Sequence, residues 1–172
     1  MKIKSPLIIL LGLAVGSAAL AASADKAASA VQVTFVAPEK FTDAKEGYMD
    51  TERGRDALLG QLKEHIMTRA AKYLRAGQRL EITVTDVDLA GDFEPWRGLQ
   101  FHDVRIVKDL YPPRASLQFR LLNADGTVVS EGKRQLQELG YLMTLALPTW
   151  DPLRYDKEML SDWLRQEFKH ST

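Results

Sequence analysis

Alternating and helical hydrophobic patterns organise the first half of the chain. Residues 31–35 alternate apolar and polar side chains, which predicts a strand that buries Val31, Val33 and Phe35. From residue 51 to 74 the apolar spacing becomes that of a helix with one hydrophobic stripe. We expect this helix to pack on the sheet through that stripe, which comprises Leu58, Leu59, Leu62, Ile66, Ala70, Tyr73 and Leu74.

Four further strands are predicted in the middle of the chain. The second strand alternates from Leu80 to Val84, and its phase changes near Asp86, which predicts a bulge or a bend there. A third strand is expected at residues 104–110 and a fourth at residues 115–121. Residues 123–126 (NADG) favour a hairpin turn with a positive φ at the glycine, so a fifth strand should run from residue 127 to about residue 133.

The chain ends on a predicted amphipathic helix at residues 155–168, with Trp163 among its buried side chains. Before it, residues 136–150 are apolar without a clean period. Strands joined by hairpins and helices grouped around them favour an α+β fold. We expect an antiparallel sheet of about five strands, a long helix after the first strand and a C-terminal helix.

Residues 1–24 have the pattern of an export signal. Lys2 and Lys4 precede a short apolar run that closes on small residues, and cleavage is expected before Ala22 or Asp25. The apolar run is shorter than the roughly 20 residues of a spanning helix. We therefore expect a cleaved signal peptide, a periplasmic location and no membrane span after cleavage.

Composition limits the size and chemistry of the exported part. Residues 25–172 suffice for a single domain, with a disordered lead-in to about residue 30. The chain has 23 basic and 23 acidic residues, so it offers no electrostatic basis for binding nucleic acid. It has no cysteine, which excludes disulfides, thiolate metal sites, thiol nucleophiles and a lipoprotein anchor.

A cluster of carboxylates follows the second predicted strand. Neighbouring carboxylates can bind a hard cation or perform acid/base chemistry. The spacing fits an EF-hand poorly, because Arg97 stands where the bidentate glutamate should be. The structural alternative is a strand end and turn, in which Asp86 or Asp88 caps backbone amides. The candidates for catalysis are Asp86, Asp88, Glu94 and His102, with Asp92 and Asp103 nearby.

Other chemistry has little support in the sequence. His102 is in phase with Val104 and Ile106, which predicts a place at the rim of the core, and the three histidines lack the short spacing of a zinc site. Nucleophile elbows and glycine-rich phosphate loops are absent. We therefore expect no metal and no cofactor.

Loop aromatics are the remaining candidates for recognition. Trp96 and Trp150 lie in loops that contain proline. Together with Arg97 or Arg114 they could grip a ligand or partner. The alternative is that they cover an end of the sheet.

Several segments resemble the domain-of-unknown-function family numbered 3016. The block from residue 85 to 96 is the most specific of them, and together they cover nearly the whole exported part. The resemblance implies a small exported protein of Gram-negative bacteria and supplies no activity or catalytic residue. The segments are residues 38–43 (PEKFTD), 77–92, 94–96 (EPW), 111–114 (YPPR) and 151–157 (DPLRYDK), leading to Met159, Leu160 and Trp163.

We expect a periplasmic, non-enzymatic interaction or accessory protein of the cell envelope, whose partner is an unidentified envelope protein or ligand. One alternative is a carboxylate-based hydrolase, with or without a metal, built on the four candidates above. Another is a carrier of envelope lipid or a small ligand, with residues 136–150 as one wall of its pocket. The oligomeric state is left open.

Overall fold

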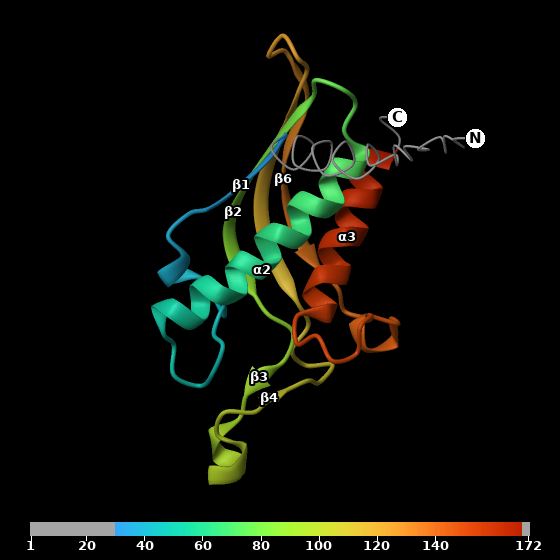
Figure 1. The fold of residues 1–172 in the computed structure, drawn as a ribbon. Helices are drawn as coiled ribbons and strands as arrows, with labels where there is room; N and C mark the ends of the chain where they lie inside the picture. The colour runs from blue at the N-terminus through green and yellow to red at the C-terminus, as the bar shows by residue number, and fades with distance from the viewer. Residues whose placement is uncertain (1–29, 170–172) are drawn as a thin grey trace, which may run out of the picture.

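A four-stranded sheet carries two helices on one face (Figure 1). The computed structural model describes residues 30–169, so the predicted signal peptide and lead-in lie outside the described residues. Across the sheet the strand order is β1-β2-β5-β6. The main elements are β1 (Val31–Phe35), α2 (Glu52–Ala70), β2 (Arg79–Asp88), β5 (Arg114–Leu122), β6 (Val128–Gln137) and α3 (Arg154–Phe168).

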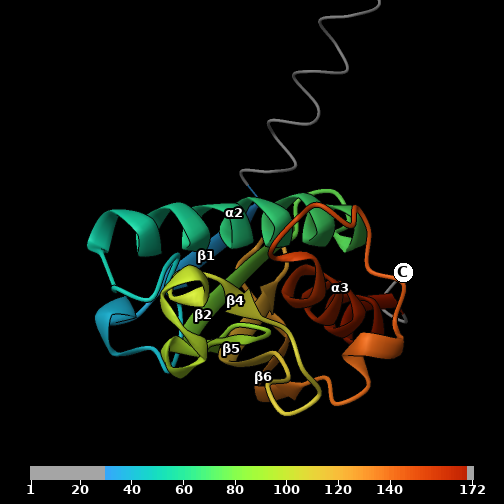
Figure 2. The same cartoon turned by 90° about the horizontal axis from the view of Figure 1, so that it is seen from below.

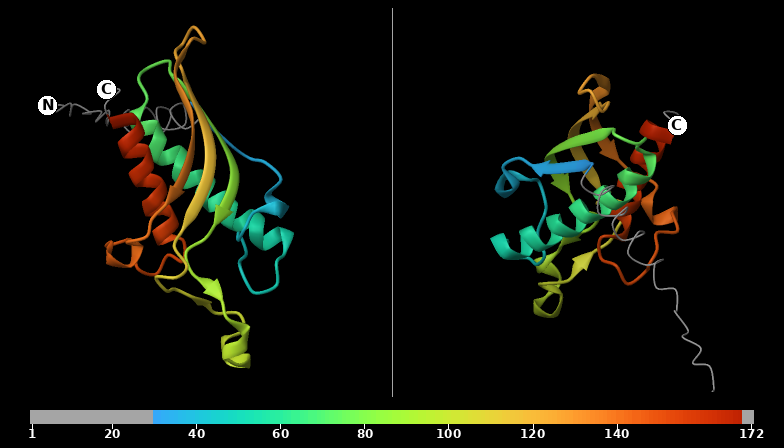
Figure 3. Two further views of the ribbon diagram at one scale, coloured as in Figure 1. Left: turned by 180° about the vertical axis from the view of Figure 1, so that it is seen from behind. Right: turned by 45° about the horizontal axis from the view of Figure 1, so that its top comes forward.

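An arm, defined here as residues 92–112, extends from one end of the main sheet (Figures 1 and 2). It contains a two-stranded ladder of β3 (Asp92–Phe93) and β4 (Arg105–Ile106), with two short 3-10 helices between them. The arm lies at the end opposite the β5–β6 hairpin turn (Figure 3). The short 3-10 helices of the chain are η1 (Pro38–Lys40), η2 (Ala71–Tyr73), η3 (Pro95–Arg97), η4 (Leu99–Phe101) and η5 (Tyr141–Met143).

The α+β class, the helix after the first strand and the C-terminal helix are confirmed, but two details of the sheet were wrong. β1 pairs with β2 in parallel, because α2 carries the chain back before β2 begins. The main sheet has four strands rather than five. The expected third strand at residues 104–110 is reduced to β4, which pairs with β3 instead of joining the main sheet.

The predicted helical stripe forms the core of the protein. α2 begins after Thr51, whose Oγ1 accepts a hydrogen bond of 3.1 Å from the Gly54 N–H. Leu62 and Ile66 are almost fully buried against the sheet. Trp163 is in the core as predicted and contacts Phe119 at a ring-centroid distance of 6.0 Å.

Local turn chemistry also follows the sequence. The register between β2 and β5 shifts between Val84 and Asp86, which confirms the predicted bulge. Gly126 has a φ of 85°, so the hairpin turn uses its glycine as expected. No helix within residues 30–169 combines the length and apolar character required to span a bilayer.

The packing of α2 predicts a large difference between two of its positions. Leu62→Ala should lower the free energy of unfolding by about 2–5 kcal/mol, because it leaves a cavity under the helix. Glu64→Ala, at an exposed position of the same helix, should cost less than about 0.5 kcal/mol. Urea unfolding measures both, and equal losses would contradict the placement of the stripe.

Candidate functional site

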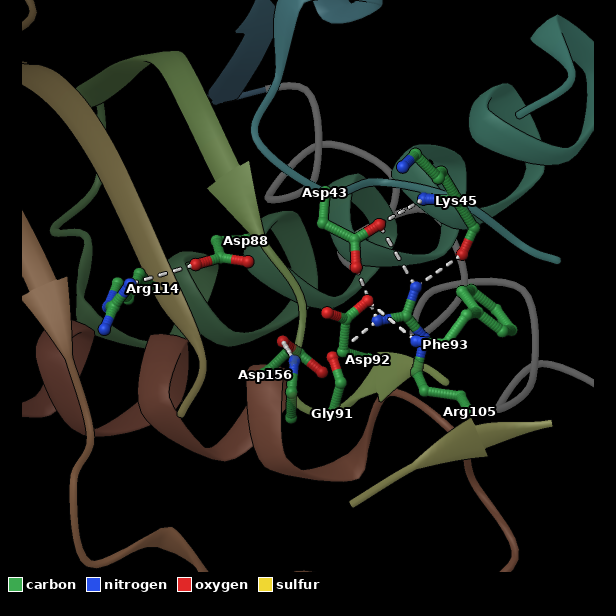
Figure 4. Close-up of polar contacts among 10 residues, drawn as sticks. Asp43, Lys45, Asp88, Gly91, Asp92, Phe93, Arg105, Arg114 and Asp156 are labelled. Carbon is green, nitrogen blue, oxygen red and sulfur yellow. Dashed lines mark hydrogen bonds and ion pairs between the residues drawn. The ribbon is translucent and has the colours of Figure 1, made fainter. Parts of the chain in front are cut away.

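A polar cleft lies at the end of β2, between the segment that precedes α2 and the base of the arm. Its volume is about 270 Å³, and it is lined by acidic and basic side chains. Figure 4 shows these groups, which come from segments far apart in the sequence. They include Asp43, Lys45, Asp88, Asp92 and Arg114.

The guanidinium of Arg105, on β4, is the centre of this region. It donates two hydrogen bonds to the carboxylate of Asp43, at 2.7 and 3.2 Å. It also donates to the carbonyls of Gly91 and Lys45, both at 2.8 Å, and lies 4.6 Å from the ring centroid of Phe93. Both charged side chains are largely buried. One side chain thus joins the arm, the turn after β2 and the segment before α2.

The segment that carries Asp43 is held against β2 by its own backbone. The Asp43 N–H donates to the Val87 carbonyl at 2.9 Å, and the Leu89 N–H donates to the Asp43 carbonyl at 3.0 Å. Asp86 accepts from the backbone N–H and the hydroxyl of Thr42, at 2.7 and 2.9 Å. The carboxylate of Asp86 is therefore occupied in fixing this segment.

Asp88 lies in the cleft opposite Arg114. The nearest oxygen–nitrogen distance between them is 3.3 Å. Partial burial raises the pKa of Asp88, the guanidinium of Arg114 opposes that rise, and the carboxylates of Asp43 and Asp92 add to it. The site therefore disfavours a further negative charge.

Glu94 lies apart from the cleft, inside the base of the arm, and only 2% of its surface is exposed. Its carboxylate accepts hydrogen bonds from the side chains of Lys108, Arg97 and Tyr111, the last at 2.9 Å. These bonds, led by that from Lys108, lower the pKa of Glu94 to about 2. A general acid needs a raised pKa, so Glu94 is suited to anchoring the arm and poorly suited to donating a proton.

The four catalytic candidates do not share a site. Asp86 binds Thr42 and Glu94 is enclosed by the cations of the arm. His102 was expected at the rim of the core, which is wrong. It lies in the arm against Tyr48, with ring centroids 4.3 Å apart, because residues 102–104 belong to the arm and not to a strand of the main sheet. Within residues 30–169 no group of three or more His, Asp or Glu is arranged to hold a metal ion.

The recognition candidates lie in three different segments: Trp96 and Arg97 in η3, Arg114 at the start of β5, and Trp150 in the loop before α3. Trp96, in the arm, is 72% exposed, and Trp150 is 82% exposed. Arg97 is bound to Glu94 and Arg114 faces Asp88, and both arginine side chains remain about half exposed, at 44% and 51%.

Residues 138–150 form an exposed loop beside the arm. Residues 136 and 137 of the apolar stretch belong to β6, and Tyr141–Met143 form η5 within the loop that follows. Tyr141 is buried in this loop, donates its hydroxyl to the Lys108 carbonyl, and packs on Tyr155 with ring centroids 4.9 Å apart. The 138–150 loop is thereby fastened to the base of the arm.

Asp156 is a site residue that the sequence analysis missed. It lies in the first turn of α3 and is 3% exposed. One carboxylate oxygen accepts from the Ala90 N–H at 3.0 Å, and the other has no partner. Burial raises its pKa to about 7. The signal was available, since Asp156 stands three and four positions before the buried Met159 and Leu160.

Asp156 predicts a pH dependence of stability. The protonated carboxyl is favoured in the folded state, so the unfolded state binds fewer protons between about pH 4 and pH 7. The contribution of Asp156 to the free energy of unfolding should therefore fall as pH rises through this window, by at most about 1.4 kcal/mol per pH unit. His65 contributes in the opposite direction, because burial lowers its pKa to about 4. Asp156→Asn should remove this contribution of Asp156, so the dependence of stability on pH, measured by urea unfolding at several pH values, should become more positive than in the wild type. Asp109→Asn, at an exposed position, should retain the wild-type dependence, and an unchanged slope in Asp156→Asn would contradict the assignment.

Comparison with known proteins identifies the family. No curated protein matches the chain. Among solved structures, the chain is similar to a dodecameric PelC variant from Paraburkholderia phytofirmans, at 12% identity and a TM-score of 0.37, over 80% of this chain and 85% of that one. This likeness is too distant to indicate a function. The model for the family described as "Protein of unknown function (DUF3016)" matches residues 29–166, so the chain belongs to the DUF3016 family.

Proposed function

We propose that this protein is a periplasmic, non-enzymatic interaction protein of the cell envelope that attaches to an anionic lipid surface. The observation that carries the proposal is the exposure of large apolar side chains on the arm and on the 138–150 loop. Both segments lie at the same end of the molecule (Figures 1 and 3). Export by the sequence-predicted signal would bring the protein to the envelope.

The exposed side chains are unusually large for a surface in water. At the tip of the arm Leu99 is 92% exposed, next to Trp96. The 138–150 loop contains one side chain that is charged at neutral pH, Glu138, among its thirteen positions. Apolar surfaces of this kind mark interaction sites. The exposed apolar residues of the loop are Leu139, Leu142, Met143, Leu145, Leu147 and Trp150.

The shape of this end favours a lipid surface over an enclosed ligand. A carrier holds its ligand in a concave, largely apolar pocket. Here most of the apolar side chains of the 138–150 loop point into solvent, and Met143 is 92% exposed, while Tyr141 and Ala146 are buried. Protruding loops that carry tryptophan and leucine suit insertion at the boundary between headgroups and acyl chains.

Two partly exposed cations at the base of the arm, Arg97 and Lys108, can contact anionic headgroups. The negative charge of Glu94 lies between the cations of Arg97 and Lys108, so these three side chains carry a net charge of +1, which the exposed Asp109 beside Lys108 offsets. Arg97 directly follows Trp96 in the sequence. Cations next to an inserted apolar loop add electrostatic attraction to anionic lipids.

Hydrolysis by the carboxylates has weaker support. An acid/base pair needs two groups at one place with their pKa values separated. Asp86 is occupied by Thr42, and Asp88 faces Arg114. Glu94 is held ionised by its partners, with its pKa lowered to about 2.

Vesicle co-sedimentation tests the proposal with the protein produced from its full chain. We expect binding to phosphatidylglycerol-containing vesicles and weaker binding to pure phosphatidylcholine. Replacing Trp96 and Leu99 together by serine should weaken binding by about tenfold or more, because two large apolar contacts are lost. The same is expected when Met143 and Trp150 are replaced together.

Val129→Ser is the matched control, because Val129 is exposed near the hairpin turn at the other end of the molecule. It should bind vesicles like the wild type. Absence of vesicle binding, or binding that both double variants retain, would overturn the proposal. Capture of an envelope protein through these residues without vesicle binding would do so as well.

A further inference from the structure

The outer edge of β6 has no strand partner among residues 30–169. β6 is the last strand of the sheet and, with ten residues, as long as β2. On one side it pairs with β5 throughout most of its length. Alternate backbone N–H and C=O groups of an edge strand point away from the sheet and are available to another strand. On β6 the Lys133 carbonyl also accepts a hydrogen bond of 2.9 Å from Arg134 Nη1.

The side chains at the middle of β6 are complementary to themselves in reverse order. Glu131 and Lys133 flank Gly132, and all three belong to the regular part of the strand. If a second β6 lies antiparallel about a two-fold axis at Gly132, Glu131 faces Lys133 of the second copy. The same pair then forms again on the other side of the axis.

Neighbouring registers lack this complementarity. An axis at Glu131 places two glutamates opposite one another, and an axis at Lys133 places two lysines opposite one another. Like charges directly opposite each other destabilise a strand pair. The charge pattern therefore selects the register centred on Gly132.

Charges on the open face of the sheet continue the same pattern. Arg120, on β5, lies 3.5 Å from the Glu81 carboxylate and 3.4 Å from the Glu131 carboxylate. The row across the sheet is therefore negative, positive and negative, and ends at the edge on Glu131. A lysine from a second copy would lie beside Glu131 and add a positive charge at the end of this row.

Position 132, near the centre of β6, has no room for a side chain. A Cβ atom there would lie 2.7 Å from Arg134 Nη1 and 3.2 Å from Phe119 Cε1. Arg134 is itself fixed by a bidentate contact with Glu167 on α3, at 2.7 and 2.8 Å. Arg134 therefore cannot easily move to make room, and position 132, where the proposed two-fold axis passes, has no side chain.

We propose that two copies of this chain pair through β6, antiparallel about Gly132, into one continuous sheet. We assign the free edge to a second copy because the order of Glu131 and Lys133 along β6 is complementary to itself when the strand is reversed. The surface is distinct from the apolar loops of the proposed function.

Sedimentation velocity of the protein produced from its full chain, over a dilution series, tests this pairing. The wild type should form dimers that dissociate on dilution. Glu131→Lys and Lys133→Glu should each weaken the dimer by about tenfold or more, because both ion pairs become like-charge contacts. Glu131→Lys combined with Lys133→Glu should restore it, and Glu64→Lys, on the exposed side of α2, should leave it unchanged. A monomeric wild type, or a dimer that both single reversals leave intact, would overturn the proposal.

Cross-linking checks the register independently of the reversals. The chain has no cysteine, so introduced thiols are the only ones present. Facing residues of an antiparallel hydrogen-bonded pair have Cα atoms about 5.5 Å apart, within reach of a disulfide. A mixture of Glu131→Cys and Lys133→Cys proteins should form a cross-linked dimer under mild oxidation, faster than either protein alone. Equal rates in the mixture and in the separate proteins would contradict the register.

Discussion

The Arg105 guanidinium joins three segments that lie far apart in the sequence. It makes four hydrogen bonds, to Asp43, Gly91 and Lys45, in a largely buried position. Removing two charges from water is costly, and it is offset here because the donors and acceptors are matched. The β3–β4 ladder has only two residue pairs, too few to be stable alone. The position of the arm, and of the apolar side chains at its tip, therefore depends on this contact.

The acidic side chains at the end of β2 and in the arm hold this region together, and they do not form a shared reactive centre. Asp86 fixes the segment before α2, and Glu94 gathers two cations and a tyrosine inside the base of the arm. Asp156 contributes a buried carboxyl beneath the turn. The polar groups at the end of β2 thereby hold a rigid base from which the two apolar loops project.

Local sequence patterns correctly predicted the helices and strands that bury one face, but they did not predict how the strands pair or which distant segments meet. The stripe of α2, the bulge near Asp86 and the hairpin at Gly126 each follow from short-range rules. The alternation of Val104 and Ile106 predicted a core strand, yet Val104 is exposed because the arm leaves the sheet. The Asp43–Arg105 contact spans 62 residues and has no local signal. The parallel pairing of β1 could have been expected from a helix between two strands.

Among the candidate site residues, the sequence located the polar region but not its function. Carboxylate spacing along a chain does not say which donors face each group, and here every candidate carboxylate has partners of its own. The exposure of Trp96 and Trp150 also depends on the tertiary structure, because loop tryptophans are as compatible with covering a sheet end as with recognition. The apolar stretch before α3 was ambiguous for the same reason, and only its contact through Tyr141 places it beside the arm.

Hydrogen exchange in Arg105→Lys tests the dependence of the arm on this contact most directly. Lysine keeps the charge but cannot reach the carboxylate and both carbonyls at once. The Gly91 N–H donates to the Tyr111 carbonyl and the Val104 N–H to the Phe101 carbonyl. The account predicts that these two amides lose about tenfold or more of their protection, while those of β2 and β5 keep theirs. Arg120→Lys, on the open face of the sheet, should leave the arm protected. Unchanged protection of the arm in Arg105→Lys, or an equal loss throughout the sheet, would contradict the account.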